Sequence, residues 1–166
     1  MDEKYNSMED LMRYFIADTH FNHENIIKYC NRPFENVKEM NEYIITKWNS
    51  VVTKNDIVYH LGDVGFGTRE ELKNLVSRLN GTKILIRGNH DFRRGVNGWK
   101  KVGFVEVYRK RLILDNLILT HEPIEVEENF INVFGHIHDK PLDAKFNKEN
   151  HICVSCDVID YTPQIL

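Results

Sequence analysis

Five short apolar runs, each followed closely by aspartate, asparagine or histidine, constrain the fold of this chain more than any other feature of its sequence. They span residues 13–17, 57–61, 84–86, 117–119 and 131–134. Runs this short and this apolar are typical of buried β-strands. An α/β fold commonly gathers functional residues at the C-terminal ends of its strands, because the sheet holds them in fixed positions. We therefore expect a sheet protein with a polar site at the strand ends.

Helical patterns lie between the first runs. Apolar side chains recur every three or four residues over residues 37–51, which predicts an amphipathic helix. Thr68 and Glu71 have the spacing of a capping box, which predicts a helix running to about Leu79. From about Phe104 onward the pattern is rich in strands. This order indicates an α/β sandwich of two sheets with helices outside.

Length and composition favour one compact domain over residues 1–166, with ordinary globular usage of apolar and charged residues. Lys and Arg number 22 against 25 Asp and Glu, so the net charge of −3 offers no general attraction to long duplex nucleic acid. We expect no membrane span, because no apolar run approaches the ~20 residues required. The polar first residues and the three cysteines predict a cytoplasmic protein without a signal peptide.

The polar residues after the runs are of few chemical types. Two pairs, Asp18 with His20 and His136 with His138, are spaced by two, so an extended backbone would direct each pair to one side. Glycines precede several of these residues and allow close approach. Seven residues supply oxygen or imidazole donors that suit divalent metals: Asp18, His20, Asp63, Asn89, His121, His136 and His138.

The ordered motifs DTH, GD, GNHD, TH and GHIH resemble those of the calcineurin-like metallophosphoesterase family, over positions 18–138. The strings DTHFNHENI, NRPF, KWNS, YHLGD and VSCDVIDYTP resemble a small, single-domain bacterial and phage branch of that family. The resemblance implies a four-layer α-β-β-α sandwich, with two mixed sheets flanked by helices. It also implies hydrolysis of a phosphate ester by water activated between two cations.

By the same resemblance, Asp18, His20, Asp63 and His138 would hold one metal, and Asp63, Asn89, His121 and His136 the other. His90 would be the catalytic histidine that is not a ligand, and Asp91 would orient and charge it. Manganese is the first choice of metal; iron, zinc, nickel and cobalt also suit these donors.

Several residues near the motifs have two readings. His23 would touch a substrate phosphate or cap the helix over residues 24–29. Arg32 is the better of two arginines for binding a substrate phosphate, whereas Arg87 is interpreted as a solvated or salt-bridged strand end. The run 109–111 is interpreted as a charged strand edge that discourages aggregation.

Three functions fit the fold. The first is a phosphohydrolase acting on a small substrate, with a diester such as a nucleotide derivative favoured over a monoester. The second is a catalytically inactive binding scaffold, and the third is a single-strand nuclease. The complete set of predicted ligands, together with His90, favours the enzyme, because a scaffold does not need them. The oligomeric state is not readable from the sequence.

Overall fold

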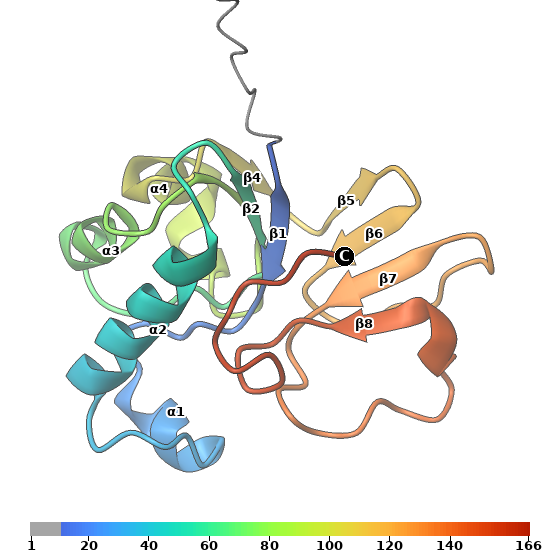
Figure 1. Cartoon of the computed structure of the whole chain (residues 1–166), viewed down its shortest axis with the longest axis horizontal. Coiled ribbons are helices and arrows are strands. Elements are labelled where there is room, and N and C mark those ends of the chain that lie inside the picture. The colour runs from blue at the N-terminus through green and yellow to red at the C-terminus, as the bar shows by residue number, and fades with distance from the viewer. Residues whose placement is uncertain (1–10) are drawn as a thin grey trace, which may run out of the picture.

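The computed structural model describes residues 11–166 and arranges them as two four-stranded sheets packed face to face (Figure 1). The strands are β1 (Arg13–Ile16), β2 (Ile57–His60), β3 (Thr82–Ile86), β4 (Glu106–Tyr108), β5 (Arg111–Leu114), β6 (Leu117–Thr120), β7 (Ile131–Phe134) and β8 (His151–Cys153). The first sheet has the order β1-β2-β3-β4 and is parallel throughout. The second has the order β5-β6-β7-β8, and only the β5–β6 pair is antiparallel.

The α-helices cover the outer face of the first sheet (Figure 1). They are α1 (Glu24–Tyr29), α2 (Val37–Val51), α3 (Arg69–Val76) and α4 (Gly95–Val102), with short 3-10 turns η1 (Phe92–Arg94) and η2 (Lys148–Asn150). Loops cover the second sheet: Phe146 lies against His151, with ring centroids 5.0 Å apart, and His151 lies against Phe134.

The α/β sandwich with two sheets and flanking helices is thus confirmed, with two differences in detail. The first sheet is parallel, not mixed. Among residues 11–166 no α-helix covers the outer face of the second sheet. The physical reason is that the connections after Thr120 and Phe134 carry no apolar stripe of helical period, so they pack as loops.

The first sheet separates two apolar cores because its side chains alternate between faces. Tyr14 and Ile16 of β1 pack toward the helices, whereas Phe15 and Ala17 pack between the sheets. Trp48 of α2 is fully buried in the helix-side core. The amphipathic stripe of α2 and its burial therefore agree with the sequence pattern.

Helix α3 begins as predicted, with a reciprocal capping box between Thr68 and Glu71. It ends at Val76, and the chain continues to the predicted end, Leu79, in tighter turns, in which the Leu79 N–H donates to the Val76 carbonyl. The short elements α4 and β4 carry no pattern strong enough to have been predicted.

The segment after β8 crosses from the second sheet to the first. Ala17 donates its N–H to the Val154 carbonyl at 2.8 Å, and Cys156 donates to the Ala17 carbonyl at 2.9 Å. These bonds place the residues around Ser155 beside the C-terminal end of β1. The two sheets therefore meet where the predicted polar residues lie.

No helix within residues 11–166 combines the length and apolarity needed to cross a membrane. The prediction that the chain lacks a signal peptide rests on residues 1–10, which lie outside the described residues.

Candidate metal centre

The seven predicted ligands follow strand ends of both sheets. Asp18 and His20 come after β1, Asp63 after β2 and Asn89 after β3. His121 follows β6, and His136 and His138 follow β7. Strands that are distant in sequence thus bring their donors to one edge of the sandwich.

Five of these residues have a left-handed backbone, contrary to the extended geometry expected from their spacing. The φ angles are 57° at Asp18, 48° at His20, 58° at Asp63, 68° at His136 and 54° at His138. This conformation is uncommon for residues other than glycine and costs free energy. Asp18 and His20 reach one group of donors because the chain turns at these residues, whereas His136 and His138 reach different groups.

The donors form two compact groups, Asp18 with His20 and His138, and Asp63 with His121 and His136. Within each group the ligand atoms all lie within 4.8 Å of one another. Asp63 lies between the groups, because its Oδ2 is 3.7 Å from His20 Nε2 and 3.4 Å from His121 Nε2.

Asn89 belongs with the second group. Its Oδ1 is 2.9 Å from His121 Nε2 and 3.2 Å from His136 Nδ1, and those two nitrogens are 3.2 Å apart. A cavity of about 380 Å³ opens over both groups, and Asp63, Asn89 and His90 are among the residues that line it.

Buried atoms without partners show that the site fits a cation. Asp18 Oδ1 and both ring nitrogens of His20 are buried and make no hydrogen bond within residues 11–166. A buried polar atom without a partner costs about 1–3 kcal/mol. A divalent cation would satisfy Asp18 Oδ1 and one nitrogen of His20, because carboxylate oxygen and neutral imidazole are common ligands of such metals. Burial lowers the pKa of His20 well below its usual value, so the ring is neutral and able to bind a metal.

Two residues that sequence reasoning missed hold the ligands in place. His138 Nδ1 donates to Asp157 Oδ2 at 2.6 Å, and the Ser155 hydroxyl donates to Asp18 Oδ2. Both residues lie in the string VSCDVIDYTP, which carried the resemblance but no assigned chemistry. Their sequence signal was their presence in that string alone.

Two ligand histidines carry raised pKa values. Burial lowers the pKa of His138, but the hydrogen bond to Asp157, the contact with Cys30 and the negative charges of Asp18 and Asp157 together outweigh it, and the pKa rises to about 10. At His121 burial again lowers the pKa. The hydrogen bond to Asp63, the negative charges of Asp18 and Asp63 and the bond to the Leu61 carbonyl together outweigh it, so the pKa of His121 rises to about 9. Both rings are therefore protonated at neutral pH until a metal displaces the proton.

Arg32 supports the structure of the site from inside the protein, so its prediction as a substrate contact is wrong. Its guanidinium is fully buried and forms a bidentate pair with Asp157 at 2.8 and 3.0 Å. It also donates to the backbone carbonyls of Asp18 and Thr19. With its donors occupied inside the protein, Arg32 fixes the loop after β1 and the acceptor of His138.

Asp91 also differs from its predicted role. Its carboxylate accepts backbone N–H bonds from Asp63, Val64 and Gly88, at 2.8, 3.1 and 2.8 Å. Those bonds join the loops after β2 and β3, and no bond reaches the His90 ring. Burial raises the pKa of Asp91 to about 7, against the three N–H donors that lower it. Asp91 is therefore a positioning residue for Asp63.

His90 lies at the mouth of the cavity. Its side chain is 46% exposed, and its Nε2 is 3.9 Å from Asp63 Oδ2. Its backbone N–H donates to Asp63 Oδ1 at 3.0 Å. The ring belongs to neither ligand group, so it can meet a substrate bound there.

His23 occupies the N-cap position of α1, but its side chain makes no capping bond. Its ring lies against Phe66 with centroids 4.4 Å apart, and its buried Nδ1 has no partner among the described residues. The capping role is therefore wrong, and the substrate contact stays a prediction.

The fold and the donor geometry are those expected of a metal-dependent phosphoesterase, and sequence comparison agrees. The family model of calcineurin-like phosphoesterases matches residues 13–155, so the chain belongs to that family.

Relatives occur in archaea, phages and bacteria. An uncharacterized protein of Methanocaldococcus jannaschii is 43% identical over 158 residues, covering 90% of this chain and 84% of that protein. The Gene 66 protein of Mycobacterium phage L5 is 36% identical over 81 residues, covering 47% of this chain and 39% of that protein. A crystal structure of a protein of unknown function from Aquifex aeolicus has a TM-score of 0.72 at 28% identity, covering 93% of this chain and 95% of that one.

Proposed function

We propose that this protein hydrolyses a phosphate ester at a centre of two divalent metals. The observation that carries the proposal is the pair of donor groups on either side of Asp63, with unpartnered buried atoms on Asp18 and His20. The first metal would be held by Asp18, His20, Asp63 and His138, and the second by Asp63, Asn89, His121 and His136. Manganese is our first choice, because mixed nitrogen and oxygen donors suit it; iron, zinc, nickel and cobalt are the alternatives.

Two bound cations lower the pKa of a water molecule and neutralise charge on the phosphoryl oxygens. Side chains of the protein position the ligands and supply the proton. Asp63 fixes the spacing of the two ligand groups, and Asp91 fixes Asp63 through backbone bonds. His90 faces the cavity and donates a proton to the leaving oxygen as the ester bond breaks. The open cavity of about 380 Å³ suits a small substrate, and we infer a diester such as a nucleotide derivative.

The test is hydrolysis by metal-stripped protein of a chromogenic phosphodiester and the matching monoester, with manganese, nickel, zinc or magnesium added back in turn. We expect turnover only with added metal, highest with manganese and faster on the diester. Absence of turnover with every metal, despite measured metal binding, would contradict the proposal.

His90→Ala tests the proton donor separately. We expect turnover to fall by about 10²- to 10⁴-fold while metal content stays the same, because the ring binds no metal. The matched control is His151→Gln, which changes a histidine on the outer face of the second sheet and should leave turnover unchanged. Full activity of His90→Ala would sink the assigned role.

A further inference from the structure

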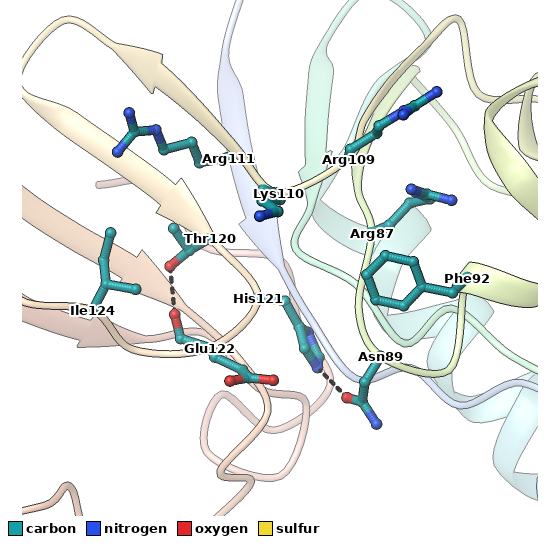
Figure 2. A pocket seen from close by; sticks show the side chains of 10 residues that line it. All are labelled: Arg87, Asn89, Phe92, Arg109, Lys110, Arg111, Thr120, His121, Glu122 and Ile124. Carbon is teal, nitrogen blue, oxygen red and sulfur yellow. Dashed lines mark hydrogen bonds between the residues drawn. The ribbon is translucent and has the colours of Figure 1, made fainter.

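A second cavity, of about 630 Å³, adjoins the metal centre (Figure 2). Asn89 lines both cavities, and His121 lines the second. The second cavity lies where the ends of β3 and β6 face the connection between β4 and β5, which passes from one sheet to the other. A substrate whose scissile phosphate lies on the metals can therefore extend past Asn89 into this space.

Arg87 is the buried cation of this cavity, and its side chain makes no ion pair within residues 11–166. It is only 8% exposed, which is contrary to the expected solvated strand end. Its Nε is buried without a hydrogen-bond partner, and no carboxylate of the described residues pairs with it. The guanidinium lies over the ring of Phe92, with Cζ 4.7 Å from the ring centroid (Figure 2). Its donors are therefore positioned and free.

The rest of the lining adds positive charge. Lys110 lies between the two sheets, with Arg109 and Arg111 extending to opposite sides of it (Figure 2). Glu122 is the single carboxylate among the lining residues, and it is exposed. Four cations against one anion in a chain of net charge −3 make this a local anion-attracting site. A buried guanidinium with free donors matches the oxygens of a phosphate.

We propose that this cavity, through Arg87 and Lys110, binds a second phosphate group of the substrate. The inference rests on the proposed function and names its substrate class: a small phosphodiester that carries another phosphate beside the one that is cleaved. Phe92 positions the Arg87 guanidinium by stacking.

Two chromogenic substrates with the same scissile ester test this inference: thymidine 5′-(p-nitrophenyl phosphate) and the same compound carrying a 3′-phosphate. We expect the wild-type protein to have a kcat/KM about tenfold higher for the second compound, since hydrogen bonds between an arginine and a phosphate are stronger than those between neutral groups. Arg87→Gln should bring the ratio of the two values close to one, mainly through KM. Arg93→Gln is the matched control, because it removes the same charge from the same turn as Phe92, outside the cavity lining.

Lys110→Gln should also lower the ratio of the two kcat/KM values. Because Lys110 is exposed, this variant serves as the test if Arg87→Gln does not fold. Calorimetric binding of thymidine 3′,5′-bisphosphate and thymidine 5′-phosphate gives the same comparison without turnover. The second-phosphate site would be overturned if the wild-type protein and both variants showed the same preference for the compound with the 3′-phosphate, in hydrolysis or in binding. Failure of the proposed function would give another result: neither compound would be hydrolysed with any metal, even if the protein bound one compound more tightly than the other.

Discussion

Three histidines of the candidate metal centre differ in what holds the ring nitrogen that faces away from the other donors. His138 Nδ1 donates to Asp157, and His121 Nδ1 donates to the Leu61 carbonyl at 2.7 Å. His20 has no such partner within residues 11–166, and its ring stacks instead on His138 with centroids 5.3 Å apart. The orientation of His20 therefore depends on the rings packed around it, among them His138 and Phe66.

Asp157→Asn should weaken metal binding by about 10- to 100-fold, because residues that orient a metal ligand typically contribute that much. The substitution removes the charge that holds His138 and leaves Arg32 without its ion pair. A competition titration with a chelating indicator measures the effect. Asp160→Asn is the control, since Asp160 lies on the same segment, is exposed and pairs with Lys47 instead. Equal metal affinity in both variants would show that Asp157 does not orient the ligand.

Metal binding should release protons and tighten as the pH rises. His138, with a pKa of about 10, and His121, with a pKa of about 9, are protonated at neutral pH without metal. A proton on the coordinating nitrogen competes with the metal, so affinity increases from about pH 6 to about pH 8. Calorimetry in two buffers of different ionisation enthalpy measures the protons released. A binding heat that is the same in both buffers would contradict this prediction.

At the scale of elements, the loops after the strands do most of the positioning. The loop after β7 passes so close to the end of β1 that Gly135 has no room for a side chain. A Cβ there would meet Ala17 Cβ, and Asp18 Oδ2 at 2.7 Å. The His136 N–H also donates to Asp18 Oδ2, at 2.8 Å. This contact links a ligand loop of the second sheet to a ligand of the first.

Gly135→Ala should therefore destabilise the protein by about 1–3 kcal/mol and reduce metal affinity, because the added methyl group separates these loops. Denaturant unfolding and a metal titration measure the two effects. Gly98→Ala is the control: it also brings a Cβ close to a neighbour, Arg94 Cγ at 2.6 Å, but it lies in α4, which carries none of the predicted ligands and where alanine favours the helix. If Gly135→Ala bound metal as tightly as the control, the close approach would have no role in the site.

At the scale of the whole molecule, the donors of the candidate metal centre come from both sheets. Asp18, His20, Asp63 and Asn89 extend from the first sheet, and His121, His136 and His138 from the second. Apart from the centre, the sheets are held together by an apolar core and by the segment after β8. A metal that needs ligands from both sheets binds only the folded protein.

Metal should for this reason raise the stability of the whole protein. A ligand present at about 100 times its Kd adds about 2.7 kcal/mol per site. Thermal unfolding with manganese should thus occur at a higher temperature than unfolding with a chelator. Asp63→Asn, which removes the carboxylate between the groups, should lose most of this difference. Unfolding at one temperature in both conditions would show that the centre does not bridge the sheets.

The sequence alone was enough to predict the core strands, the amphipathic helix α2, the start of α3 and the set of candidate donor residues. It could do so because these features are local: strand and helix periods, a capping box and the order of Asp, Asn and His after apolar runs. The side-chain types after each strand indicated a metal site before any contact was known.

The contacts of the polar side chains could not be predicted from the sequence, because the partners are far apart in the chain. Arg32 and Asp157 are separated by 125 residues, and Ser155 and Asp18 by 137. Arg32 is thereby a buried support and Arg87 a free donor, the reverse of what their neighbours in sequence suggest. The left-handed turns at the ligands are likewise stabilised by the packed loops, since no local preference of aspartate or histidine requires them.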